Sequence, residues 1–200
     1  PTHQSVFDLA VLRAMPNMAV IVAADAPEAK AAVKAATAYD GPVYLRLSRA
    51  EVPIVFSQGE PEFEVGRGRV LRDGADVSLI ATGVLLHRAL AAADQLAGQG
   101  IDARVVEIHT LKPIDESILL EAAEQTGAIV TVEEHSIIGG LGGAVAEVLG
   151  RSRPAPIEMV GLRDTFAESG PYEALLDAYG MGVGDIVAAT RSALARKPRR

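Results

Sequence analysis

The chain has 200 residues, enough for one large domain or two small ones, and 49% of them are hydrophobic. Its net charge of −7 argues against a nucleic-acid-binding protein, which would usually present a basic face. The absence of cysteine excludes disulfides and thiolate metal sites and is typical of a cytoplasmic protein, and no apolar stretch is long enough to predict a membrane span.

The first stretch predicts a helix over residues 5–15 with a histidine just before it. Ser5-x-x-Asp8 has the form of a capping box, and apolar residues cover most of the helix circumference, so we expect burial on more than one side. His3 would lie near the positive end of the helix, where a neutral imidazole can contact a substrate oxygen or relay a proton. The alternative is a solvated histidine near the end of the chain.

The next elements predict a parallel strand pair joined by a helix. Residues 18–23 and 43–48 have the Val/Ile/Leu content of strands, and Asp25 can cap a helix between them that runs to about residue 38. Two strands are too few for a stable sheet. Either they pack on the second half of the chain, or the missing strands belong upstream of it.

A change in composition predicts a linker. Prolines, glycines and acidic residues interrupt the pattern over residues 50–68, which suggests a segment over residues 1–57, a linker over 58–67 and a second domain over 68–200.

The second half predicts an open, mostly parallel α/β sheet of about five strands with helices on both faces. Residues 68–71 and 77–81 flank an Asp-Gly turn and could form a hairpin. We expect Asp115 to cap the helix that follows it and residues 133–143 to form a loop. The expected strands are 103–108, 128–132 and 157–160, and the expected helices are 84–97, 116–125, 144–150, 171–179 and 185–195.

Arg49 is the best candidate for binding an anion. It follows the carboxyl end of strand 43–48, where ligands gather in open α/β sheets, and a guanidinium can grip a phosphate with two parallel N–H bonds. The alternative is a surface ion pair with Glu51 or Asp40. Arg46 lies within the same strand on the face opposite Leu45 and Leu47, so we expect a structural or interface role for it.

Two other motifs carry weaker functional signals. The run Gly139-Gly140-Leu141-Gly142-Gly143 suggests a dinucleotide loop, but it stands too far from the preceding strand and follows two glutamates, which favours close backbone packing instead. Glu133, Glu134 and His135 could suggest a metal site, but adjacent strand residues face opposite ways and no further ligand lies nearby in the sequence. We therefore predict no metal ligands in this chain. His87 and His109 are expected to be surface or satisfied core residues.

Several motifs, taken in order and spacing, resemble the C-terminal part of the transketolase family, especially the small subunits of split transketolases. They are Pro1-Thr2-His3-Gln4, Met15-Pro16-Asn17-Met18, the stretch 41–49 that ends in Leu47-Ser48-Arg49, Leu79-Ile80-Ala81-Thr82-Gly83, Leu111-Lys112-Pro113-Ile114-Asp115 and Thr131-Val132-Glu133-Glu134-His135. The resemblance spans nearly the whole chain.

The resemblance implies a dimeric enzyme that uses thiamine diphosphate and Mg²⁺ to move a two-carbon ketol unit between sugar phosphates. Residues 1–57 resemble the last third of the pyrimidine-binding domain, and residues 68–200 resemble the C-terminal domain, which contributes homodimer contacts. His3 matches a histidine that contacts substrate, and Arg49 matches the arginine that holds the sugar phosphate.

Motifs that bind the cofactor in this family are absent, so we expect the chain alone to be inactive and to bind no cofactor without the N-terminal part or large subunit of the same enzyme. Two alternatives within enzymes remain, a deoxyxylulose-phosphate synthase and the β subunit of a 2-oxoacid dehydrogenase E1. A non-catalytic dimerisation or regulatory module is the alternative from another class.

Overall fold

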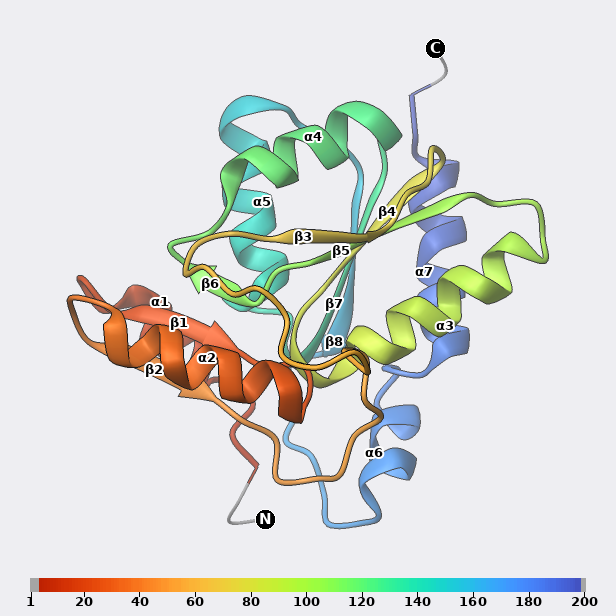
Figure 1. Cartoon of the computed structure of the whole chain (residues 1–200). Helices are drawn as coiled ribbons and strands as arrows, with labels where there is room; N and C mark the ends of the chain where they lie inside the picture. The colour runs from red at the N-terminus through yellow and green to blue at the C-terminus, as the bar shows by residue number, and fades with distance from the viewer. Residues whose placement is uncertain (1–3, 199–200) are drawn as a thin grey trace.

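The computed structural model describes residues 4–198 and contains two sheets (Figure 1). The helices, one of them a short 3₁₀ turn, are α1 Asp8–Ala14, α2 Ala26–Ala38, η1 Gly83–Leu85, α3 Leu86–Ala97, α4 Glu116–Thr126, α5 Leu141–Ser152, α6 Tyr172–Ala178 and α7 Val183–Ala195. The strands are β1 Ala19–Val22, β2 Val43–Arg46, β3 Arg69–Arg72, β4 Val77–Ala81, β5 Ala103–Glu107, β6 Thr110–Lys112, β7 Ile129–Ser136 and β8 Ile157–Leu162.

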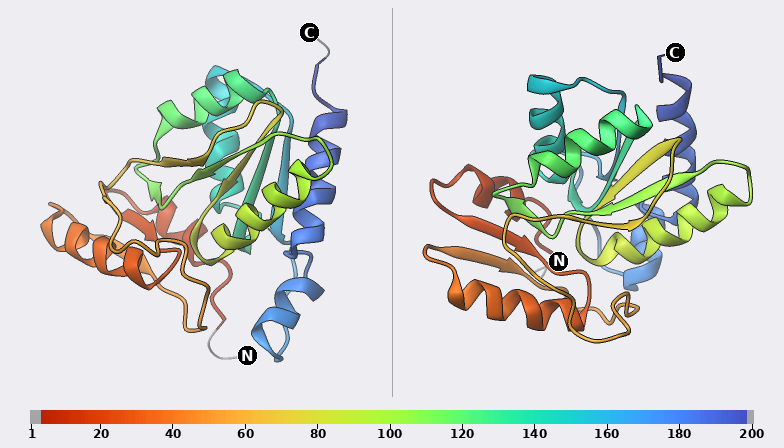
Figure 2. Two further views of the ribbon diagram at one scale, coloured as in Figure 1. Left: turned by 45° about the vertical axis from the view of Figure 1, so that its right-hand side comes forward. Right: turned by 45° about the horizontal axis from the view of Figure 1, so that its top comes forward.

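The larger sheet confirms the predicted open α/β architecture. Its strand order is β3-β5-β4-β7-β8, with β3 antiparallel at one edge and the other four strands parallel. Helices α3 and α7 cover one face, and α4 and α5 cover the other (Figures 1 and 2). Successive residues of β4 serve the two faces: Leu79 packs with the α3–α7 side and Ile80 with the α4–α5 side.

The smaller sheet joins the N-terminal segment to the rest of the chain. β1 and β2 pair in parallel, as predicted, but β6 from the second half adds to β1 in the antiparallel direction, giving the order β2-β1-β6. Leu9, Val20 and Val22 are buried in the same cluster as Ile80 and Leu119. The N-terminal elements therefore pack on the second half, which was one of the two predicted possibilities.

Three sequence predictions were wrong in their details. β3 pairs with β5 rather than with β4, because β5 lies between β3 and β4 in the sheet. The start of β5 packs under the Asp-Gly turn, where Ala75 N donates to Asp102 Oδ2 at 3.0 Å. β7 continues to Ser136, so the predicted loop over residues 133–143 is mostly strand and helix. Ser5 does not cap α1, which begins only at Asp8 and buries just Asp8 and Leu9.

The predicted caps of two other helices are present. Asp25 accepts from Glu28 N at 2.9 Å at the start of α2, and Asp115 accepts from Ile118 N at 3.2 Å at the start of α4. Within residues 4–198, no helix combines the length and the apolar character needed to cross a membrane.

Candidate functional site

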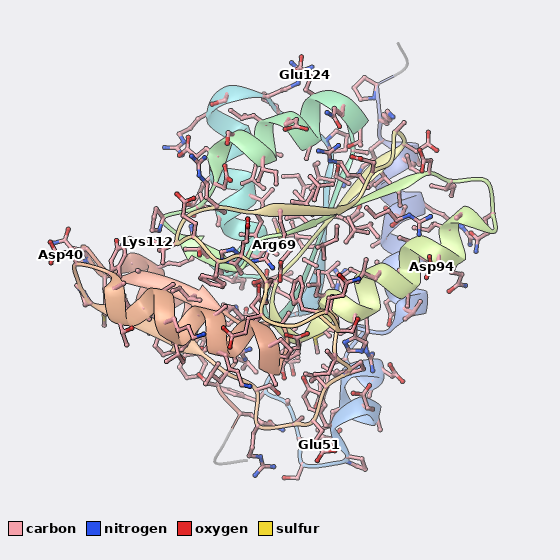
Figure 3. The ribbon with its side chains drawn as sticks, viewed as in Figure 1. Asp40, Glu51, Arg69, Asp94, Lys112 and Glu124 are labelled. Carbon is pink, nitrogen blue, oxygen red and sulfur yellow. The ribbon has the colours of Figure 1, made fainter. Side chains whose placement is uncertain are left out.

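Of the two predicted site residues, the structure places one. His3 lies outside the described residues, which begin at Gln4. Arg49 is exposed just after β2, and no ion pair joins it to Glu51, Asp40 or another acid in the described part of the chain. Figure 3 shows Glu51 on the outer rim of the loop that follows β2. The guanidinium of Arg49 is therefore open to an external anion.

Arg49 and the stretch that follows His3 border the same cavity, which has a volume of about 600 Å³. One side is formed by Gln4, Ser5 and the end of β2. The other side belongs to the second domain, where α6 contributes Tyr172 and β7 contributes Glu134. The structure thus brings together residues separated by more than a hundred positions in the sequence.

Arg46 forms the centre of a polar network beside this cavity. Its Nε donates to Asp8 Oδ2 at 3.1 Å, one terminal nitrogen donates to Glu134 Oε2 at 3.0 Å, and the other donates to the carbonyl of Ser5 at 3.0 Å. The side chain is only 14% exposed. The predicted structural role of Arg46 is confirmed, and its partners come from both halves of the chain.

Two tyrosines extend the network. Tyr44 Oη donates to Asp8 Oδ2 at 2.7 Å, and burial together with this carboxylate raises the pKa of Tyr44 to about 12. Burial also raises the pKa of Tyr172, and the nearby charge of Glu134 adds to the effect. Both phenols are therefore neutral hydrogen-bonding groups at physiological pH.

His135 caps α1 from the other domain. Leu9 N donates to His135 Nε2 at 3.2 Å, and Nδ1 lies 2.7 Å from the carbonyl of Ser136, so a neutral ring that is protonated on Nδ1 satisfies both contacts. Burial lowers the pKa of His135 and keeps the ring neutral. The cap that the sequence assigned to Ser5 is thus supplied through tertiary structure.

Glu133 explains the glycine-rich run. Its carboxylate accepts from Leu141 N at 2.6 Å and Gly142 N at 2.8 Å at the start of α5. A Cβ on Gly140 would lie 2.0 Å from Glu133 Oε2, so only glycine admits this carboxylate. An internal acid occupies the helix start where a dinucleotide phosphate would bind, which confirms the close backbone packing predicted for this run.

A second buried polar cluster lies at the seam between the two sheets, away from the cavity. Arg69 pairs with Glu107 Oε2 at 3.2 Å and with Glu28 Oε1 at 3.3 Å, and Figure 3 shows it between β3 and the N-terminal layer. Burial raises the pKa of both glutamates, and the charge of Glu28 raises that of Glu107 further. Nearby, burial and the charge of Arg69 lower the pKa of His109 to about 3, so its ring is a neutral core residue stacked on Phe63.

Sequence reasoning located Arg49 but missed the groups around it. Asp8, Tyr44 and Glu134 lie in quoted motifs and Tyr172 in none, but no motif indicated that they border this cavity, because their roles depend on contacts across the fold. The one available signal was an arginine inside the otherwise apolar strand 43–47, since such a charge must find partners. Within residues 4–198, no group of three His, Asp or Glu side chains is placed to hold a metal ion.

Two family models match the chain. The model of the transketolase C-terminal domain matches residues 66–186, and the model of the transketolase pyrimidine binding domain matches residues 1–55. Among curated relatives, the 6-deoxy-6-sulfo-D-fructose transketolase subunit SqwH of Clostridium sp. (strain MSTE9) is 43% identical over 98% of this chain and 61% of its own length. The 1-deoxy-D-xylulose-5-phosphate synthase 1 of Geobacter sulfurreducens is 39% identical over 98% of this chain and 31% of its own length.

A solved structure shares the fold along almost the whole chain. It is described as a split gene transketolase, inactive beta4 tetramer, and it has 52% sequence identity and a TM-score of 0.95 over 98% of this chain and 64% of that chain. The chain therefore spans less than two thirds of the length of the Clostridium subunit and of the solved split transketolase.

Proposed function

Since this chain belongs to the transketolase family, we propose that it is the C-terminal portion, or small subunit, of a thiamine-diphosphate-dependent transketolase. The complete enzyme transfers a two-carbon ketol unit between sugar phosphates. One observation carries this proposal: Arg49 has no acidic partner among the described residues and stands beside a cavity that it shares with the stretch following His3.

The contribution of this chain to the reaction is the binding of substrate. The guanidinium of Arg49 would hold the phosphate of the sugar through two N–H bonds, while His3 would contact the ketol end of the same molecule. Tyr44, Arg46, Asp8 and Glu134 are hydrogen-bonded to one another and border the cavity. They leave Arg49 as the free cation of the described part of the cavity wall.

The described residues do not fit thiamine diphosphate and Mg²⁺. They offer no acidic cluster for a metal ion, and the carboxylate of Glu133 is already bound to the start of α5. In our proposal the N-terminal part or large subunit supplies the groups that hold the cofactor, and we assign no step of the transfer to residues 4–198 through it.

The outer face of α1 supports the need for such a partner. Phe7, Val11 and Met15 stand four residues apart and are 57%, 49% and 43% exposed, so they form an apolar stripe on one side of the helix. Within the described chain β2 also has an open edge, since only β1 pairs with it. We propose that the N-terminal part or large subunit covers both features, and homodimer contacts through the second domain remain a further prediction.

The test is reconstitution of ketol transfer from this chain and a candidate large subunit. Removing a charged phosphate contact should raise the KM for the sugar phosphate by roughly 10–100-fold in Arg49→Ala, because such hydrogen bonds are worth about 1.5–3 kcal/mol. Arg67→Ala is the matched control, since Arg67 is an exposed arginine of the linker that pairs only loosely with Glu64 at 3.6 Å. An unchanged KM for Arg49→Ala would refute its assignment.

The same assay separates the alternatives. The likeness to 1-deoxy-D-xylulose-5-phosphate synthase favours that activity as the second candidate, and formation of 1-deoxy-D-xylulose 5-phosphate without ketol transfer would select it. Tight thiamine diphosphate binding by the 200 residues alone would contradict the proposed division of labour. No activity with any large subunit would favour the non-catalytic module.

A further inference from the structure

The two arginines at the end of β2 differ in one decisive respect. Each of the three nitrogens of the Arg46 guanidinium already donates to an oxygen of this chain, whereas Arg49 has no acidic partner among the described residues. Three of the five N–H groups of Arg46 are thus taken and its charge faces two carboxylates, so it is less suited than Arg49 to bind a phosphate, although it borders the same cavity. The role of Arg46 therefore depends on the segments that its hydrogen bonds join.

Arg46 connects the two segments that carry the proposed substrate contacts. It stands three residues before Arg49, and it reaches the carbonyl of Ser5, two residues after His3, as well as Asp8 at the start of α1. Tyr44 strengthens this link by donating to the same oxygen of Asp8. The N-terminal stretch is thus fixed directly against β2.

The end of β7 holds the same stretch from the other side. Glu134 takes the third bond of Arg46, Ser136 N donates to the carbonyl of Val6 at 2.8 Å, and Leu9 N donates to His135. The separation of Arg49 from the stretch that follows His3 therefore depends on a buried side chain and on strand β7.

We propose that Arg46 is a positioning residue: through Asp8, the Ser5 carbonyl and Glu134 it sets the separation of Arg49 from the N-terminal stretch that follows His3. This assignment rests on the proposed function. It also gives the second domain a role in the reaction, because Glu134 orients the arginine without touching the substrate.

A neighbouring arginine provides the matched control. Arg13 also crosses from α1 to the second domain, where it donates to the carbonyl of Gly139 at 2.7 Å and pairs with Glu147 at 2.7 Å. Its side chain is 13% exposed, against 14% for Arg46. It makes no bond to β2, so its loss should weaken the same seam without moving Arg49.

The experiment compares Arg46→Gln, Arg46→Lys and Arg13→Gln in the complete enzyme by steady-state kinetics and thermal unfolding. Both glutamine variants should lower Tm. We expect Arg46→Gln also to lower kcat/KM for the sugar phosphate by roughly 100-fold, the scale of effect seen when a reacting group is misplaced by about 1 Å. Arg46→Lys, which keeps one ion pair, should recover part of this loss, and Arg13→Gln should keep kcat/KM unchanged.

Two results would overturn the positioning role of Arg46 but leave the proposed function intact. One is an unchanged kcat/KM in Arg46→Gln, and the other is an equal loss of kcat/KM in Arg13→Gln. If Arg46→Gln does not fold, Glu134→Gln is tested in its place, because this variant keeps the bonds of Arg46 to Asp8 and Ser5. The proposal then requires that Glu134→Gln lower kcat/KM. It fails if kcat/KM equals that of the unmodified enzyme. An unmodified complete enzyme without ketol transfer overturns the proposed function first and the assignment with it.

Discussion

Gly140 offers a sharp test of the buried carboxylate at the start of α5. An alanine Cβ at this position would lie 2.0 Å from Glu133 Oε2 and 2.7 Å from His135 Nδ1, far inside van der Waals contact. Glu133 is fully buried, so its carboxylate cannot swing into solvent. Gly140→Ala must therefore break the two bonds that Glu133 accepts from Leu141 N and Gly142 N.

The magnitude follows from those two bonds. Burial raises the pKa of Glu133 to about 7, so above that pH, where the group is ionised, each hydrogen bond to it contributes about 1.5–3 kcal/mol and the lower figure for the pair is about 3 kcal/mol. In a chain of this length that loss lowers Tm by roughly 6–12 °C. The assay is thermal unfolding followed by circular dichroism on the full chain.

Gly150→Ala is the matched control within the same helix. A Cβ on Gly150 would meet no atom within 4 Å, and alanine in a helix interior is about 1 kcal/mol more favourable than glycine. This variant should therefore raise Tm by roughly 2–4 °C. A Tm for Gly140→Ala within about 2 °C of the unmodified chain would refute the reasoning about Glu133.

Two further predictions concern the buried acids elsewhere. Burial, with the charge of Glu28, raises the pKa of Glu107 well above 4.5, so between pH 4.5 and that raised pKa the folded chain keeps the proton of Glu107 while the unfolded chain releases it, and stability falls by up to about 1.4 kcal/mol per pH unit as pH rises. The Glu107→Gln variant has no group that titrates at this position. Its free energy of unfolding, measured with urea, should therefore rise relative to that of the unmodified chain from pH 5 to pH 8. A constant difference between the two free energies would contradict this prediction. Asp115→Ala should cost about 1–2 kcal/mol in the same assay by removing the α4 cap, whereas Asp115→Asn should retain most of it, and equal losses would exclude capping as the cause.

Elements with local signals were the ones that the sequence predicted well. Asp25 and Asp115 cap helices whose first turns lie in the next three residues, so the chemistry is complete within a short window. The parallel strands β4 and β5 are fully buried and mostly aliphatic, which composition detects although β5 also carries Arg104 and Glu107. In these elements no residue from a distant part of the chain replaces the local interaction that the sequence predicts.

The wrong predictions share a tertiary cause. Ser5 looked like a local cap, but the first turn of α1 is bonded by His135, which lies 126 residues away from Leu9. The polar run at residues 133–135 looked like a loop, because each of its side chains would be costly in a buried strand without a partner. Glu134 and His135 find their partners in distant parts of the chain, at Arg46 and Leu9, and no local pattern predicts those contacts.

The candidate site divides along the same line. Arg49 could be located because it follows a recognisable strand, at an edge where ligands gather. The network that surrounds it could not, since Asp8 and Glu134 meet only through Arg46 across 126 positions of sequence. From the sequence, Arg46 could be predicted only to need a partner for its charge.

The end of β7 explains why the N-terminal segment takes one defined position on the second domain. Glu133 and His135 point to one face of the strand and are buried, while Glu134 points to the other face and borders the cavity. These three consecutive residues bind the start of α5, the end of β2 and the start of α1. Buried ion pairs add little net stability compared with apolar packing, but breaking one is costly, so each contact penalises a shift of its element. The seam is therefore better suited to fixing geometry than to adding strength, as the proposed substrate site between the two segments would require.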